Sequence, residues 1–320
     1  MAINLHASPD WPYQVNAGGV VYKVENDQRV YAILIRRGYK FDADTETYNL
    51  TKGRVDGDEN LEQAALREVK EESGITAKPI AYLGAIQRSF TIHITIDRAT
   101  HYYLMEYIDR DADAMDDEHD EVVWLPADEA IQKLSKQPKQ EEDIIARAEE
   151  WFGSGQQKTM NGPSGLISLH ADPNNPFHVS AGGLVFRENG GIKEAILLRK
   201  HEIEGPEFHL PKGTVENGEN LEQTATREVS EETATSSKPL AYLGAQEDRV
   251  LSLKKFPMIK STHYYLFEWQ NDLDKPIDPE HDEALWFTFK EAKERLDGPM
   301  KQQRKIIERA EEWFGKFGDA

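Results

Sequence analysis

The sequence predicts an α/β protein of two similar domains, each a mixed sheet between helices. Its 320 residues suit two domains of ordinary size. Segments of the first half return about 160 residues later: VNAGGV at 15–20 returns as VSAGGL at 179–184, and PIAYLGA at 79–85 as PLAYLGA at 239–245. This period is far too long for a solenoid. We therefore interpret the chain as a tandem duplication, with domain 1 at 1–153, a linker at 154–165 and domain 2 at 166–320.

Both halves show the same order of elements, strand–strand–helix–strand–strand–helix. The last helix is the clearest, because Ile144, Ile145, Ala148 and Trp151 recur at helical spacing. The order lacks the strict strand–helix alternation of a doubly wound fold, and so favours a mixed sheet. In the first half the predicted strands are 18–24, 31–35, 100–107 and 122–125, and the predicted helices are 62–73, 128–134 and 141–152.

The composition excludes several classes of function. With 38 Lys+Arg against 58 Asp+Glu the formal net charge is −20, which disfavours nucleic-acid and anionic-membrane partners. Zero cysteines exclude disulfides, thiolate nucleophiles and zinc–thiolate sites. The first residues do not resemble a signal peptide, and no apolar run approaches the ~20 residues of a spanning helix. We expect a cytoplasmic protein.

The residues suited to chemistry are concentrated in one helix of each half. Glu68, Glu71 and Glu72 stand at i, i+3 and i+4, so the three carboxylates project from one helix face, and Arg67 lies one turn before Glu71. Such carboxylates repel one another unless a cation offsets them, and hard oxygen ligands suit Mg²⁺ or Mn²⁺. A solvated acidic helix is the alternative reading for one copy. The same spacing returns at 227–232, which favours a shared chemical role.

The full spacing resembles the signature of the Nudix hydrolase family. Residues 53–75 match it at every fixed position, from Gly53 to the Gly-aliphatic pair that ends it. Residues 213–235 match it except at Ala234 and Thr235, which replace that pair. The resemblance implies two α/β/α sandwich domains and metal-dependent hydrolysis of a nucleoside diphosphate linked to another moiety. If a left-handed cap is kept at Ala234, it costs on the order of 1 kcal/mol relative to glycine.

The resemblance also implies roles for individual residues, with Mg²⁺ or Mn²⁺ as cofactor. A further acid late in the fold can join the metal site or act as base in related enzymes. An equally good reading of the acids found there is a solvated turn. For phosphate binding, the best-placed cations lie beside the two motifs or at a strand end. The expected metal ligands are Glu68, Glu71, Glu72, Glu228, Glu231 and Glu232. The expected catalytic residues are Glu68, Glu71, Arg67, Glu228, Glu231, Arg227, Glu118 and Glu280. The expected substrate-binding cations are Arg36, Lys52, Arg199 and Lys212.

Several substrates remain open at this point. A dinucleoside polyphosphate, with diadenosine polyphosphate first, is the preferred substrate, and nucleoside triphosphates and diphosphoinositol polyphosphates are the alternatives. From another class, the chain could be a nucleotide sensor with one or both sites inactive. Tyr102, Tyr103, Tyr264 and Tyr265 could stack on a base, although strand alternation places at least one of each pair in the core. The expected partner is a small nucleotide or polyphosphate, with the oligomeric state open.

Overall fold

The fold repeats one arrangement of strands and helices in the two halves of the chain. The computed structural model describes residues 2–38, 45–91, 93–137, 139–155, 165–202, 205–252 and 255–318. Residues 156–164 of the predicted linker lie outside these ranges. The first half contains β1 (Tyr13–Glu25), β2 (Gln28–Arg37), β3 (Glu46–Asn49), β4 (Thr51–Arg54), α1 (Leu61–Ser73), β5 (Ile75–Thr91), β6 (Thr95–Arg110), β7 (Glu121–Pro126), α2 (Ala127–Leu134) and α3 (Glu142–Gly153). The second contains β8 (Phe177–Asn189), β9 (Ile192–Glu202), β10 (Gly205–His209), β11 (Lys212–Thr214), α4 (Leu221–Thr233), β12 (Thr235–Leu251), β13 (Pro257–Asp272), β14 (Glu283–Thr288), α5 (Phe289–Arg295) and α6 (Arg304–Phe317).

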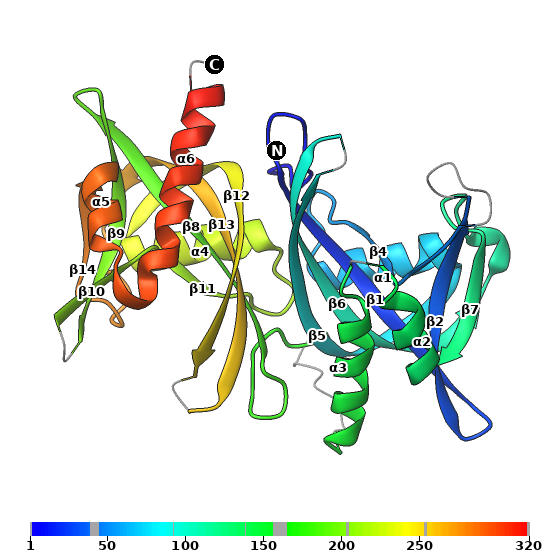
Figure 1. Ribbon diagram of the computed structural model, residues 1–320. Helices are drawn as coiled ribbons and strands as arrows, with labels where there is room; N and C mark the ends of the chain where they lie inside the picture. The colour runs from blue at the N-terminus through cyan, green and yellow to red at the C-terminus, as the bar shows by residue number, and fades with distance from the viewer. Residues whose placement is uncertain are drawn as a thin grey trace.

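Each half builds a seven-stranded mixed sheet, as the sequence predicts. The strand order in the first half is β3-β2-β1-β6-β5, with β4 paired to β1 and β7 to β2. Strands β1 and β6 run parallel, and the other pairings in this sheet are antiparallel. The second sheet repeats this order as β10-β9-β8-β13-β12. Figure 1 shows the two halves side by side, the first blue to green and the second green to red.

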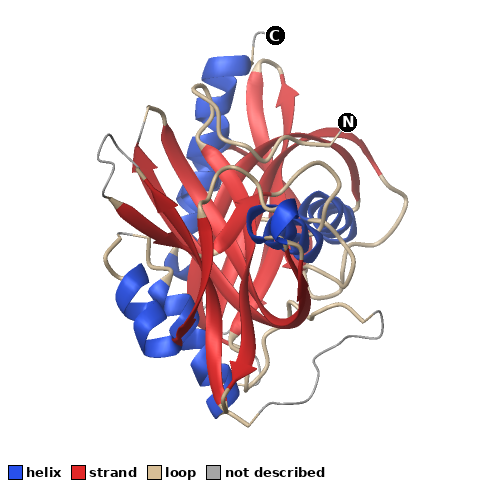
Figure 2. Cartoon of the chain, turned by 90° about the vertical axis from the view of Figure 1, so that its right-hand side faces the viewer, coloured by secondary structure: helices blue, strands red, loops and turns tan. Residues whose placement is uncertain are grey.

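Helices cover both faces of each sheet (Figure 2). In the first half α1 packs on one face through Leu61, Ala65 and Val69, which are almost fully buried. Helices α2 and α3 form a second core on the other face, which includes Ile144 and Trp151. Helices α5 and α6 form the matching core of the second half. The α/β/α sandwich that the resemblance implies is therefore present twice. None of the helices in the described ranges is long and apolar enough to cross a membrane.

The cores under α1 and α4 merge across the boundary between the halves. One continuous cluster of buried side chains includes Val69 and Tyr82 from the first half with Val229 and Tyr242 from the second. Matched hydrogen bonds join the halves at its edges: Trp11 Nε1 donates to the Tyr242 carbonyl at 2.7 Å, and Asn175 Nδ2 donates to the Tyr82 carbonyl at 2.9 Å. Since burial of apolar surface is the main stabilising term in folding, this shared core fixes the two domains to each other.

Two buried histidines meet at the centre of this boundary. His101 and His263 are fully buried, and their Nε2 atoms lie 3.0 Å apart. Each Nδ1 contacts a tyrosine hydroxyl, Tyr82 at 2.7 Å from His101 and Tyr242 at 2.8 Å from His263. Only one hydrogen fits between the two Nε2 atoms, so one ring donates and the other accepts. Burial lowers the pKa of His101 to about 3 and that of His263 well below its usual value, so the pair is neutral at pH 7.

Long strands β5 and β12 were missed by the sequence pattern. Pro79 and Gly84 interrupt the apolar pattern of β5, and its register with β6 shifts beside both residues. Because a bulge changes the side-chain alternation, a strict two-residue period does not detect this strand. The predicted helices agree with α1, α2 and α3 to within one residue at each end.

Candidate active sites

The carboxylates of the first candidate site are placed by helix α1. Asn60 caps its start: the Asn60 side chain accepts the Gln63 N–H, and the Gln63 side chain accepts the Asn60 N–H. Gly74 ends the helix in the left-handed conformation, with φ 70°. Between these caps, Glu68, Glu71 and Glu72 lie on the face that is turned toward β4 and the loop after β6, as the contacts below show.

Arg67 organises these carboxylates and the loop before the helix. Its guanidinium binds Glu59 with two hydrogen bonds, Nε to Oε1 at 2.7 Å and Nη2 to Oε2 at 2.8 Å. Its Nη1 donates to Glu68 Oε1 at 2.6 Å and to Glu71 Oε2 at 3.0 Å. Because the guanidinium is planar and its donors are fixed, this arrangement sets the orientation of three carboxylates at once. Glu59 thus supports Arg67 in this structure.

A glycine makes room for Glu68 against the sheet. A Cβ atom on Gly53 of β4 would lie 2.0 Å from Glu68 Oε2, far inside contact distance. In the second half, a Cβ on Gly213 would lie 2.1 Å from the Glu228 carboxyl carbon. Each motif therefore begins with glycine because the strand passes directly over the carboxylate.

Burial divides the three acids of domain 1 into different environments. Glu72 is 7% exposed, and its Oε2 accepts the backbone N–H of Lys52 at 2.7 Å. Burial raises the pKa of Glu72 to about 8, although Lys52 opposes this, and Glu68 and Asp116 add to the rise. Burial also raises the pKa of Glu68, while Glu71 exposes 54% of its side chain. Burial therefore disfavours the charged forms of Glu72 and Glu68 in the absence of a further cation.

The second half reproduces this geometry on helix α4. Arg227 contacts Glu219 twice, at 2.7 and 2.9 Å, Glu228 Oε1 at 2.6 Å and Glu231 Oε2 at 3.2 Å. Glu232 accepts the Lys212 N–H at 2.7 Å, and burial raises its pKa to about 8. The helix ends at Ala234, which keeps the left-handed conformation with φ 52° and donates its N–H to the Ser230 carbonyl. The departure from glycine thus leaves the carboxylate geometry unchanged.

An acid that the sequence analysis did not select lies closer to the helix than Glu118 does. Glu118 is exposed, and its N–H bonds to Asp116 Oδ1 at 3.0 Å. Asp116 donates its own N–H to the Glu71 carbonyl at 2.8 Å and raises the pKa of Glu72. Asp278 and Glu280 repeat this arrangement in the second half, with Asp278 bonded to the Glu231 carbonyl. The sequence contained one signal that could have identified these acids, because Asp116 recurs as Asp278 at the equivalent position of the second copy.

The four predicted substrate-binding cations occupy unequal positions. Lys52 forms an ion pair with Glu141, its Nζ lying 2.9 Å from Oε1, and Arg199 pairs with Glu283 at 3.1 Å. Lys212 has no carboxylate within ion-pair distance among the residues that the structure describes. Arg36 is exposed on β2; burial lowers the pKa of His119 to about 4, and Lys52 and Arg36 add to this effect.

The four tyrosines considered for base stacking are all buried. Tyr102, Tyr103, Tyr264 and Tyr265 are each at most 1% exposed. At least one of each pair was expected in the core, and the structure places both there. These rings are therefore packing residues, although Tyr103 also borders a small pocket near the start of α1.

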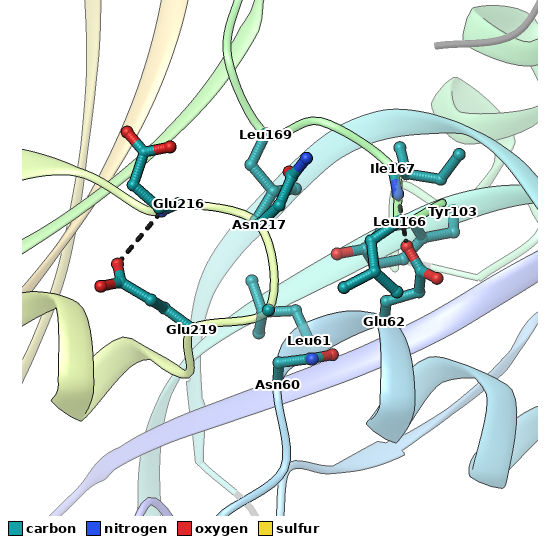
Figure 3. Close-up of a pocket in the computed structure, with 11 residues that line it drawn as sticks. Asn60, Leu61, Glu62, Tyr103, Leu166, Ile167, Leu169, Glu216, Asn217 and Glu219 are labelled. Atoms are coloured by element: carbon teal, nitrogen blue, oxygen red, sulfur yellow. Dashed lines mark hydrogen bonds between the residues drawn. The ribbon is translucent and has the colours of Figure 1, made fainter. Parts of the chain in front are cut away.

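The two candidate sites are linked by crossed N-terminal segments. The Ile167 N–H, at the start of domain 2, donates to Glu62 Oε2 of α1 at 2.8 Å, and the Ile3 N–H, at the start of domain 1, donates to Glu222 Oε2 of α4 at 2.7 Å. Figure 3 shows residues 166–169 passing between the start of α1 and the loop 216–219 of the other motif, with a small pocket between them. Asn220 Nδ2 also donates to the Asp58 carbonyl at 3.3 Å. Each carboxylate helix is therefore held partly by the opposite half.

The donor set fits a hard divalent cation. Glu68, Glu71 and Glu72 supply only carboxylate oxygens from one helix face, and a bound cation would favour the charged form of the buried Glu72. In the described residues the acidic and histidine side chains do not yet converge as a closed ligand cluster. Arg67 holds one oxygen each of Glu68 and Glu71, and the second oxygen of each carboxylate accepts no hydrogen bond from the described residues.

Comparisons with known proteins agree with this repeated arrangement. The NUDIX domain model matches twice, at residues 12–148 and 176–310. A mutator protein of Mycobacterium tuberculosis, named MutT4, is 36% identical over 89 residues, which is 28% of this chain and 36% of that protein. The alignment thus spans about a third of the relative's length.

Solved structures resemble one half of the chain at a time. The C. elegans Ap4A hydrolase in a binary complex is 20% identical, with 43% of this chain and 97% of that chain covered and a TM-score of 0.36. A MutT protein from Methanosarcina mazei Go1 is 24% identical, with 46% and 97% covered and a TM-score of 0.35. With the family model matched over most of its length, the chain belongs to the Nudix family and carries two Nudix domains.

Proposed function

We propose that the protein is a Mg²⁺- or Mn²⁺-dependent pyrophosphohydrolase with two sites, one on α1 and one on α4. The observation that carries this proposal is that the set of one arginine and four glutamates is built twice with nearly identical distances. Arg67 and Arg227 each contact their Glu partners at 2.6–3.2 Å. A set kept for packing alone would not need the exposed members, Glu71 and Glu231, at the same place in both halves.

The proposed chemistry follows from the charges of the site. A divalent ion, when bound, supplies charge neutralisation for the anhydride and makes a water easier to ionise. The protein contributes carboxylates held in place by Arg67 or Arg227, which is the preorganisation that electrostatic catalysis requires. Asp116 and Asp278 stand beside the buried Glu72 and Glu232, and we propose them with Glu118 and Glu280 as candidates for the additional acid.

For the substrate we propose a dinucleoside polyphosphate, with diadenosine polyphosphate first. Nucleoside triphosphates are the second candidate, supported by the mutator name of the mycobacterial relative. Lys52 and Lys212 lie next to the two motifs, where phosphate would approach the carboxylates. We further propose that the protein works in the cytoplasm on small molecules.

An initial-rate panel tests this proposal. Purified protein is assayed with diadenosine polyphosphates, nucleoside triphosphates, nucleotide sugars and a diphosphoinositol phosphate, in Mg²⁺ and then in Mn²⁺. Turnover that EDTA abolishes and added metal restores is expected, and the preferred substrate identifies the class. Absence of turnover on the whole panel, with the nucleotides still bound, would contradict the hydrolase and favour a nucleotide sensor.

A further inference from the structure

The largest chemical difference between the two sites lies beside the carboxylates, at the ends of the long strands. In domain 1, Arg88 of β5 and Arg98 of β6 are direct cross-strand partners. In domain 2, the equivalent partners on β12 and β13 are Asp248 and Lys260. Like charges directly opposite each other destabilise an antiparallel pair, whereas opposite charges stabilise it. Domain 1 therefore keeps an unfavourable pair where domain 2 has a favourable one.

Neither arginine of this pair has a carboxylate partner within the described ranges. Their contacts are to the Phe90 ring, with the Arg98 guanidinium 4.8 Å and the Arg88 guanidinium 6.0 Å from its centroid. Burial lowers the pKa of Arg98, which shows that its charge is only partly hydrated. An aromatic ring orders the two guanidinium groups without neutralising them.

Two lysines extend this positive cluster toward the carboxylate helix. Lys139 contacts Asn49 Oδ1, and its pKa is lowered to about 8, first by burial and then by Lys52, with Arg98 and Arg88 adding to the effect. Glu141 opposes the charges of Lys139, Arg98 and Lys52; it is buried, pairs with Lys52 and accepts the Leu50 N–H at 2.8 Å. The Lys52 backbone in turn contacts Glu72. The cluster thus adjoins the proposed hydrolytic site.

Domain 2 has a different balance of positive and negative side chains at the equivalent place. Gln303 takes the position of Glu141 and accepts the Leu210 N–H at 2.7 Å, so the fold is kept without the charge. The cations that influence one another there are Lys212 and Lys260, with Asp248 facing Lys260. Domain 1 therefore gathers four cations beside its carboxylate helix, whereas the described part of domain 2 gathers two, Lys212 and Lys260, and Glu232, Asp248 and Glu228 all act on Lys260.

We propose that Arg88 and Arg98 form a subsite in domain 1 that binds phosphate groups beyond the anhydride that is cut, and that domain 2 selects substrates with fewer phosphates. The inference rests on the proposed function, since it assigns different substrates to the two sites. Arginine suits this role because its planar fork matches phosphate oxygens and does not lose its charge. The extra phosphates can belong to a linear polyphosphate or to a phosphorylated ring.

Kinetics in single-site backgrounds test the inference. Glu231→Gln leaves only site 1 intact, and Glu71→Gln leaves only site 2. With diadenosine tri-, tetra- and pentaphosphate, KM of site 1 should fall as phosphates are added, while KM of site 2 should change little. Arg88→Asp, which recreates the natural pair of domain 2, should raise KM of site 1 for the pentaphosphate about tenfold and remove the dependence on phosphate number. A diphosphoinositol phosphate in parallel distinguishes ring-borne from linear phosphates.

Matched variants separate local charge from overall charge and from misfolding. Lys78→Asp makes the same charge change on β5 at an exposed position ten residues from Arg88, and KM should stay as in the parent. Asp248→Arg in the Glu71→Gln background should lower KM of site 2 for the pentaphosphate about tenfold. If Arg88→Asp, folded by circular dichroism, leaves every KM unchanged, or if Lys78→Asp has the same effect, the subsite does not exist.

Binding of inorganic tripolyphosphate separates this inference from the proposed function. In calorimetric titration of the Glu71→Gln/Glu231→Gln protein, the tighter binding should weaken about tenfold on adding Arg88→Asp. That result together with no hydrolysis of any substrate would overturn the function and keep the subsite. Hydrolysis by the parent protein, together with a tripolyphosphate affinity that Arg88→Asp does not change, would overturn the subsite and keep the function.

Discussion

The buried histidine pair predicts that acid weakens the contact between the domains. His101 and His263 are fully buried and neutral, and burial lowers the pKa of His101 to about 3 and that of His263 well below its usual value. The unfolded chain takes up protons near the ordinary histidine pKa of about 6.5, so between that value and 3 it binds more protons than the folded chain. Stability is therefore fully present above pH 6.5 and is lost as pH falls.

The size of the effect follows from the interval between the two pKa values. A pH of 5 lies about 1.5 units below the pKa of histidine in the unfolded chain and above the pKa of the folded His101. Protonation of this histidine therefore favours the unfolded state by about 2 kcal/mol at pH 5. The pKa of His263 is also lowered by burial, so His263 changes the stability in the same direction as His101. The variant to compare is His101→Gln/His263→Gln, in which neutral amides replace both titrating rings.

Urea unfolding at pH 7 and pH 5 measures this difference. The domains share one core, so we expect one main transition. Between the two pH values the parent should lose at least about 2 kcal/mol more than the Gln variant. His178 and His209, whose pKa values burial lowers to about 3, contribute equally to both proteins and cancel. Equal pH losses in parent and variant would refute the assignment of acid sensitivity to the interface pair.

Three further predictions concern the carboxylate helices. Ala234→Gly should raise the free energy of unfolding by about 1 kcal/mol, since Ala234 keeps φ 52°. Gly74→Ala should lower the free energy of unfolding by more than this, because its Cβ would lie 2.0 Å from the Asp111 carbonyl oxygen. Thermal melts that show equal effects of the two substitutions would contradict the cap geometry. Glu62→Ala should destabilise by about 1–3 kcal/mol, because the Ile167 N–H loses its partner, and hydrogen exchange at Ile167 should rise; unchanged exchange would show that the crossed segment is held otherwise. Mg²⁺ at 100 times its Kd should stabilise the protein by about 2.7 kcal/mol, and EDTA should remove that stabilisation. A Tm that changes with neither Mg²⁺ nor EDTA would argue against a metal at these helices.

The sequence predicted the duplication, the mixed sheets and the carboxylate helices because each leaves a local pattern. The cap, the arginine and the glutamates of each motif lie within a single stretch of 23 residues, so their spacing already encodes their geometry. Long strands with bulges, such as β5, lack that regularity and were missed.

Other features depend on contacts between distant segments. The pairing of Arg88 with Arg98 and the meeting of His101 with His263 arise from sheet register and domain packing. Glu141 lies near Lys52 only because the last helix begins beside β4. The two sequence copies differ at some of these positions, Glu141 against Gln303 and Arg88 against Asp248, but without the fold nothing showed that these differences lie together.

The most direct test of the two-site hydrolase is the metal-dependent rate of diadenosine tetraphosphate hydrolysis in four proteins: the parent, Glu71→Gln, Glu231→Gln and the double variant. Each single variant removes one carboxylate from one site and leaves the other site unchanged. We predict that each single variant keeps part of the parent rate and that the rate of the double variant falls at least a hundredfold, while all four proteins melt at the same temperature. A double variant that hydrolyses the substrate at the parent rate would contradict it.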